Sequence, residues 1–441
     1  MKLILRLLIF LALPVSGLAD PRLTAWYTLN PSQAARLYRS DADRAAGETE
    51  TTWSNGRQTQ AQPVQTGIRQ ILFSTNWIYV GSSGLPSQTM GPWYMDPEHT
   101  REFPNLPTDQ HMIFCLPRHP VMENSFGFQH LGEIGMTVDG VRIFDANDSF
   151  SYSNADGRDA DPRAGIMGHG DQFWERDAMV NEGVTFDPGM GHQQNWGTYH
   201  YHAEAIALRY ELGDHVDFDP TTKTYRESAG PPEKHSPIIG WLRDGYPLYG
   251  PYGYSNPTNP ASGVRRMISG FVPRNGENGS DDLAQTGRAT LPVWAAREWG
   301  RSTALSDDQT GPNVTDYYPI GHYLQDYAYL GDLGKVRGQD FDLDELNGRW
   351  CVTPEFPQGT YAYFTTIDAS GKPVYPYAMG KHFRGRPTGG LTRSIREPVT
   401  VYFTSSAAAP AQTSSAAPPA PATTLLWNPA NSGGYQPSSS P

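Results

Sequence analysis

The stretch Gly197-Thr198-Tyr199-His200-Tyr201-His202, near the middle of the 441-residue chain, alternates aromatic and imidazole side chains. Successive side chains of an extended strand point to opposite faces, so His200 and His202 share one face and the two tyrosines share the other. Two imidazoles on one face are a candidate pair of metal ligands. A half-buried strand with two polar positions has the same pattern, so other parts of the chain must separate the two interpretations.

A later stretch repeats this strand without its histidines. Gly359-Thr360-Tyr361-Ala362-Tyr363-Phe364 keeps the glycine, the threonine and both tyrosines, but Ala362 and Phe364 replace the histidines. If the two stretches are related strands, the fold tolerates apolar residues at both histidine positions. This comparison favours a chemical role for His200 and His202 over a structural one.

A second internal echo pairs Met167-Gly168-His169 with Met190-Gly191-His192, each followed by a polar stretch and a tryptophan. Glycine before a histidine lets a loop present the imidazole at an unusual backbone angle. A thioether beside an imidazole suits copper in an oxidising compartment better than zinc. Filling gaps in the core is, however, the commoner use of methionine. His169 and His192 are therefore candidates to join the central pair.

The composition favours short strands and many turns, because the chain has 45 Gly, 38 Pro and 24 Tyr and only 18% charged residues. The clearest hairpin joins 134–138 to 141–144 through Asp139-Gly140, which is typical of a type I′ turn. Further strands are predicted at 68–73, 77–80, 112–115, 237–241, 246–249, 360–366 and 399–403, and short helices at 32–44, 203–212 and 290–299. We expect a mainly β fold in which antiparallel sheets pack as a sandwich, with long Gly/Pro-rich connections and a few short helices.

The two ends of the chain differ in composition from the middle. Residues 1–19 have a basic start, an apolar run and small residues before Asp20, which predicts a secretory signal peptide and an exported protein, periplasmic or extracellular. Residues 20–66 form a polar N-terminal segment, and 67–404 are predicted to be a single β-rich domain. Residues 405–441, mostly Ala, Pro, Ser and Thr, predict a disordered tail.

The charge and hydropathy exclude two classes of partner. Removal of residues 1–19 takes away two basic residues and no acidic one, which lowers the formal net charge from −12 to −14. An acidic chain without a basic cluster repels phosphate backbones, so we expect no nucleic-acid binding. No stretch after residue 19 is apolar enough to predict an integral membrane segment.

Cys115 and Cys351 are the only two cysteines. In an oxidising compartment the default expectation is one disulfide between them, which would stabilise the fold by about 5 kcal/mol in the chain-entropy model. Metal binding by these thiols is the weaker interpretation, because neither cysteine has a second one nearby.

Two further motifs complete a recognisable pattern. His235-Ser236-Pro237-Ile238-Ile239-Gly240-Trp241 is followed by Asp244-Gly245-Tyr246-Pro247-Leu248-Tyr249-Gly250-Pro251-Tyr252-Gly253-Tyr254. These motifs and Tyr199-His200-Tyr201-His202 form one pattern. Because of this pattern, roughly residues 130–380 closely resemble the YHYH domain family of bacteria and eukaryotes. The resemblance implies an exported protein with a shared site, and it implies no particular reaction.

The site that we assemble combines His200 and His202 with one or two of His192, His235 and His169. Three neutral imidazoles with an open position are typical of catalytic zinc and of many copper sites. Asp244 follows an apolar strand, where its carboxylate could ligate the metal or accept a hydrogen bond from a ligand imidazole.

The first functional hypothesis is an exported protein whose histidines bind copper or zinc, for metal-assisted chemistry or for metal handling. The chain has no Gly-x-Ser-x-Gly elbow, Walker loop, dinucleotide fingerprint or His-Glu-x-x-His helix, so whether it is an enzyme stays open.

The first alternative is a secreted carbohydrate- or surface-binding module with structural histidines. Its aromatic groove would use 246–254 and 361–377 with Trp196, Trp241 and Trp350. The second alternative is a scaffold that binds calcium in the Asp-rich stretches 145–161 and 340–345, although neither stretch fits the full EF-hand signature.

Overall fold

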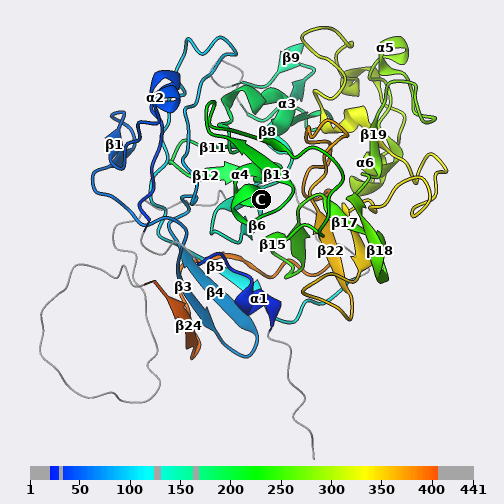
Figure 1. Cartoon of the computed structure of the whole chain (residues 1–441). Coiled ribbons are helices and arrows are strands. Elements are labelled where there is room, and N and C mark those ends of the chain that lie inside the picture. The colour runs from blue at the N-terminus through cyan, green and yellow to red at the C-terminus, as the bar shows by residue number, and fades with distance from the viewer. Residues whose placement is uncertain (1–19, 29–32, 124–130, 162–167, 406–441) are drawn as a thin grey trace, which may run out of the picture.

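The computed structural model describes residues 20–28, 33–123, 131–161 and 168–405. The predicted signal peptide and nearly all of the predicted tail lie outside these residues. Within them the chain is mainly β, as expected, and its six α-helices are short (Figure 1).

The largest sheet has eight strands in the order β11-β12-β7-β6-β15-β16-β22-β21. Its strands are β6 (Glu133–Thr137), β7 (Arg142–Phe144), β11 (Gly191–Gln193), β12 (Tyr199–Tyr201), β15 (Ile238–Leu242), β16 (Pro247–Tyr249), β21 (Gly348–Cys351) and β22 (Thr360–Phe364). This sheet is mixed rather than purely antiparallel, because β12 runs parallel to β7 and β16 runs parallel to β22. Parallel neighbours require long crossover connections, and those connections carry much of the chain outside the sheet.

The predicted hairpin at 134–144 is confirmed as the β6–β7 pair. Its turn differs from the expected type I′ turn, because only Gly140 has a positive φ, of 90°. The amide of Thr137 donates to the carbonyl of Val141, so the loop holds Val138, Asp139 and Gly140. A three-residue hairpin loop of this kind needs a left-handed conformation only at its last residue.

A second sheet has five antiparallel strands in the order β23-β5-β4-β3-β24, and in Figure 1 its strands β3, β4, β5 and β24 lie below the eight-stranded sheet. Its strands are β3 (Ile68–Phe73), β4 (Trp77–Ser82), β5 (Met112–Pro117), β23 (Gly390–Thr392) and β24 (Thr400–Thr404). Four of the five were predicted from the sequence. The missed strand, β23, is only Gly-Leu-Thr, which is too short to show a periodic pattern.

The remaining strands form small sheets on the long connections. They are β1 (Trp53–Ser54) with β2 (Thr59–Gln60), β8 (Asn147–Ser153) with β9 (Arg158–Asp159) and β10 (Glu175–Asp177), β13 (Val216–Asp219) with β14 (Thr224–Glu227), β17 (Tyr252–Asn256) with β18 (Asn259–Arg266), and β19 (Phe271–Pro273) with β20 (Tyr327–Tyr329). None of these small sheets shares a strand with the two larger sheets.

The helices are α1 (Pro21–Thr24), α2 (Asp41–Ala46), α3 (Ala178–Asn181), α4 (Ile206–Glu211), α5 (Leu283–Thr286) and α6 (Val293–Glu298). The predictions at 203–212 and 290–299 are confirmed as α4 and α6. The prediction at 32–44 is mostly wrong, because α2 begins only after its N-cap Ser40 and the preceding Leu37 bridges Glu50 in an extended conformation. Within the described ranges no helix is long and apolar enough to cross a bilayer.

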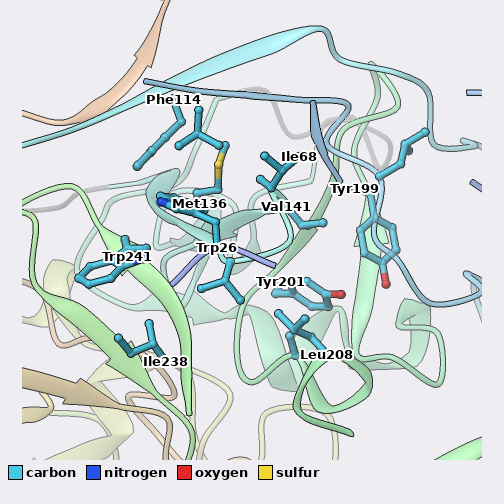
Figure 2. Close-up of a cluster of buried hydrophobic side chains, with 14 of the residues drawn as sticks. Trp26, Ile68, Phe114, Met136, Val141, Tyr199, Tyr201, Leu208, Ile238 and Trp241 are labelled. Carbon is cyan, nitrogen blue, oxygen red and sulfur yellow. The ribbon is translucent and has the colours of Figure 1, made fainter. Parts of the chain in front are cut away.

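One buried cluster of apolar side chains joins both large sheets and the N-terminal segment. Phe114 comes from the five-stranded sheet, Met136 and Trp241 come from the eight-stranded sheet, and Trp26 comes from residues 20–66 (Figure 2). Trp53, from the same N-terminal segment, also belongs to this cluster. The polar N-terminal segment therefore packs on the same core as the β-rich region. The face-to-face sandwich stays a prediction.

The expected disulfide is absent, because Cys115 and Cys351 are both free thiols. Cys115 lies on β5 in one sheet, with its thiol donating to the Gly390 carbonyl, and Cys351 ends β21 at the far edge of the other sheet. Burial raises the pKa of Cys115 to about 11, and burial also raises the pKa of Cys351. Neither thiol is therefore activated as a ligand or nucleophile at neutral pH.

Most of the aromatic residues proposed to line a binding groove are core residues instead. Trp241, Tyr249 and Tyr363 are fully buried. Of the three tryptophans proposed for the groove, Trp196 (75% exposed) and Trp350 (53% exposed) reach the surface. The packing interpretation of these aromatic residues therefore holds for the central strands.

We predict that reduction leaves the thermal stability unchanged, because Cys115 and Cys351 share no bond. Calorimetry with and without dithiothreitol measures the midpoint of unfolding, and a thiol reagent should titrate the two cysteines of the chain rapidly in denaturant and slowly in the native state. A midpoint that falls by several degrees on reduction would contradict this.

Candidate metal centre

Three buried histidines converge at one edge of the eight-stranded sheet. His200 lies on β12, His202 follows it directly, and His192 on β11 pairs with His200 across the hairpin. The Nε2 atom of His200 lies 3.2 Å from Nε2 of His192 and 3.1 Å from Nε2 of His202. Among the residues that the structure describes, these three are the one group of three or more His, Cys, Asp or Glu side chains close enough to hold an ion.

The alternation of the strand produces this geometry as the sequence predicted. His200 and His202 share one face of the strand, and Tyr199 and Tyr201 point to the other face, into the core (Figure 2). The Tyr199 hydroxyl donates to Asp187 at 3.0 Å, and the Gln88 side-chain amide donates to the Tyr201 hydroxyl at 2.7 Å. Both tyrosines are therefore fixed, and they hold the strand in register.

Backbone carbonyls fix the tautomer of two of the imidazoles. Nδ1 of His200 lies 3.0 Å from the Thr198 carbonyl oxygen, and Nδ1 of His202 lies 2.6 Å from the Asp145 carbonyl oxygen. A carbonyl oxygen can only accept, so in both rings Nδ1 carries the proton and donates. In the neutral ring, Nε2 is then an unprotonated lone pair.

The third imidazole is fixed through a hydroxyl group. Nδ1 of His192 lies 2.7 Å from Oγ1 of Thr185, and that hydroxyl donates its own hydrogen to the Glu182 carbonyl at 2.6 Å. The Thr185 oxygen therefore accepts from His192. All three Nε2 atoms consequently face the same point.

Lone pairs about 3 Å apart repel one another in a buried site, and a cation between them removes the repulsion. A tetrahedral zinc site with Zn–N bonds of about 2.0–2.1 Å has ligand nitrogens about 3.3 Å apart. The observed separations of 3.1 and 3.2 Å fit that spacing. Each ligand also has the hydrogen bond to its other ring nitrogen that metal-binding histidines usually have.

A carboxylate that the sequence did not reveal stands beside the three histidines. Oε2 of Glu182 lies 3.3 Å from Nε2 of His202 and 3.7 Å from Nε2 of His192. Glu182 caps the end of α3 where the 3-10 turn Gly183–Thr185 begins, and its side chain is 30% exposed. No motif surrounds Glu182 in the sequence, so only the folded chain identifies it.

Aromatic rings surround the imidazoles and exclude water from them. Phe144 stacks on His200 with ring centroids 4.1 Å apart, and Phe186 meets the His192 ring edge-on at 4.7 Å. The three histidines are only 3–4% exposed. Ligand bonds and charge interactions are stronger in such a low-dielectric site.

Burial and mutual repulsion lower the pKa of His192 and His200 well below the ordinary value. Burial also opposes the charged form of His202, but hydrogen bonding to Glu182 and its negative charge raise the pKa of His202 above the ordinary value. The first two rings are therefore neutral at pH 7, which is the state that binds a metal ion.

Several buried acids lie near the three histidines, and two of them are paired with cations. Asp145 pairs with Lys381 at 3.0 Å, and Asp148 pairs with Arg176 at 2.6 Å. Burial raises the pKa of Asp148 and of Asp177 to about 7, and the proximity of His202 opposes both shifts. A positive charge at the histidines would therefore favour the ionised forms of Asp148 and Asp177.

The other predicted site residues lie elsewhere. His169 is exposed, and its ring nitrogen contacts the Ser149 carbonyl at 2.7 Å. His235 is buried in the segment before β15, next to the other half of the sheet, and its ring meets Tyr249. Asp244 lies in the turn after β15 and accepts a hydrogen bond from the Tyr363 hydroxyl at 2.7 Å, and burial raises its pKa to about 6.

One methionine of the echo lies outside the part of the chain that the structure describes. Met167 lies outside the described residues, and Met190 occupies a tight turn before β11 with a φ of 72°. The group that could hold an ion contains three imidazoles, with Glu182 beside it, and these donors suit zinc and copper(II) alike.

The Asp-rich stretches proposed for calcium use their carboxylates in other interactions. Asp342 accepts two hydrogen bonds from the Arg265 guanidinium, at 2.6 and 2.7 Å. Asp344 accepts from the amide of Gly348 and from the Tyr361 hydroxyl. In the stretch 145–161, Asp148 forms an ion pair with Arg176. These contacts occupy the carboxylates named, and calcium binding stays a prediction.

Residues 113–375 match the family model described as YHYH protein. No curated protein and no solved structure matches the chain. The matched region spans more than half of the chain and contains the three converging histidines, Glu182 and the groups that bind the Nδ1 atoms. The chain therefore belongs to the YHYH protein family.

Proposed function

We propose that this protein is exported and binds one transition-metal ion, copper or zinc, through His192, His200 and His202, for metal-assisted chemistry or for metal handling. One observation carries the proposal: three Nε2 atoms converge while each Nδ1 donates to an acceptor. Export rests on the signal-peptide pattern of residues 1–19, and three histidine ligands are the donor set of many zinc and copper sites.

Glu182 decides what such a site can do. With three protein ligands, a bound ion would have an open position and would lower the pKa of a water molecule there. The Glu182 carboxylate lies beside two ligand nitrogens on the partly exposed side, so it is placed to accept a proton from that water or to fill the position itself. The first role supports chemistry, and the second supports metal storage or transfer.

We predict that the protein purified with copper or zinc available carries about one ion per chain. The double variant His200→Ala/His202→Ala should carry none, because two of the three ligands are lost. His169→Ala is the matched control, since this histidine is exposed and outside the cluster, and it should keep the ion. Elemental analysis of the three proteins is the measurement. A wild-type protein without stoichiometric metal would refute the proposal.

We further predict that Glu182→Gln weakens metal binding by about 10–100-fold, the range typical for groups that support ligands. The variant keeps all three imidazoles but loses the negative charge beside them. Competition with a chromophoric chelator gives the affinity, and Glu233→Gln, which changes an exposed carboxylate, is the control. An affinity equal to that of the wild type would remove Glu182 from the site.

A further inference from the structure

The strand order of the eight-stranded sheet reads the same from both edges. One half is β11-β12-β7-β6 and the other half is β21-β22-β16-β15, and the halves meet at the antiparallel β6–β15 ladder. Each half contains a tight hairpin, β6–β7 or β15–β16, and a second hairpin, β11–β12 or β21–β22. The two hairpins of a half meet through parallel strands, β7 with β12 in the first half and β16 with β22 in the second. The two halves therefore share one topology.

The register of the central ladder shows that the halves are related by an approximate two-fold axis. Met136 pairs with Trp241 at its centre, and the flanking pairs are Gly135 with Leu242 and Thr137 with Gly240. Gly135 in β6 corresponds to Gly240 in β15, because each follows an isoleucine, Ile134 or Ile239. A half-turn about the central pair therefore exchanges the two flanking pairs.

The outer ladders repeat the same register. Tyr201 pairs with Ile143 in the first half, and Tyr363 pairs with Leu248 in the second. Across the outer hairpins, Tyr201 pairs with Gly191 and Tyr363 pairs with Gly348. The strand Tyr199–Tyr201 therefore corresponds to Tyr361–Tyr363, as the sequence echo suggested.

The turn before each outer strand is also repeated in detail. The amide of Gly191 donates to Oδ1 of Asp187 at 3.2 Å, and the amide of Gly348 donates to Oδ1 of Asp344 at 3.2 Å. In both halves the residue just before the glycine adopts a left-handed conformation, with φ of 72° and 67°. Agreement at this level indicates two copies of one structural unit.

The correspondence places the three histidine positions in the second half. His192 pairs with His200 in the first half, and Arg349 pairs with Ala362 in the second, so Phe364 corresponds to His202. These second-half side chains are as buried as the histidines, at 5% or less exposure. The two copies share the glycines, tyrosines and aspartates that set the backbone, and they differ in the metal donors.

One imidazole with a free lone pair remains at the second position. The His235 ring lies 5.8 Å from the Phe364 ring, and its Nδ1 donates to the Ser236 carbonyl at 2.7 Å. Its Nε2 is buried and has no hydrogen-bond partner among the described residues. Unpaired buried polar atoms are rare and costly, and a metal ion is one partner that an unprotonated Nε2 can accept.

We propose that β15, β16, β21 and β22 form a copy of the metal-binding half, and that positions 349, 362 and 364 with His235 make a latent second metal site that lacks its other histidines. This inference rests on the proposed metal binding of the first half. The natural chain then binds one ion, although its sheet has two positions with the same strand register.

The test restores the donors. The variant Arg349→His/Ala362→His/Phe364→His should bind two ions per chain, and adding His200→Ala/His202→Ala should leave one. Adding His235→Ala to the restored variant should weaken the second ion at least tenfold. Elemental analysis gives the stoichiometry, and chelator competition gives the two affinities. A folded restored variant that binds only one ion overturns the proposal.

A reciprocal variant keeps the test decisive if the restored variant does not fold. His192→Arg/His200→Ala/His202→Phe places the residues of the second half in the first, and it should fold without metal, with a thermal midpoint close to that of metal-free wild type. Failure of both variants to fold overturns the equivalence. If the wild type binds no metal, the proposed function fails, whereas a restored variant that gains an ion still supports the latent site.

Discussion

The hydrogen bonds to the three Nδ1 atoms are the constraint on which the candidate site depends. Burying an imidazole costs free energy unless its polar atoms are paired. The protein pairs one nitrogen of each ring, with the carbonyls of Thr198 and Asp145 and with the Thr185 hydroxyl, and directs the other nitrogen at its two neighbours. A cation would complete this arrangement, because the three converging Nε2 atoms would then be its ligands.

The sheet supplies the precision that this arrangement needs. His192 and His200 face each other because β11 and β12 form a hairpin, and His202 lies on the same face one period further. On the opposite face, Tyr199 and its hydrogen bond to Asp187 tie the strand to the turn before β11. The second half keeps the equivalent tyrosine and aspartate without the histidines, so the scaffold does not require the metal donors.

Several features of the fold and the site could be predicted from local sequence. The period-two pattern placed His200 and His202 on one face, and the β-branched runs around Asp139-Gly140 gave the β6–β7 hairpin. Local patterns failed where the contacts were distant. Leu37 sits in a helix-like stretch but is held extended by a bridge to Glu50, and Cys115 and Cys351 lie in different sheets.

By itself the sequence determined the β character of the chain and the shared face of two histidines, because both follow from the alternation of neighbouring residues. Only the tertiary structure decided which further groups join them. It brought His192 and Glu182 to the pair and placed His235 next to the other half of the sheet. The physical reason is that a metal site depends on distances across strands, and strand order and register are set by contacts between residues far apart in the chain.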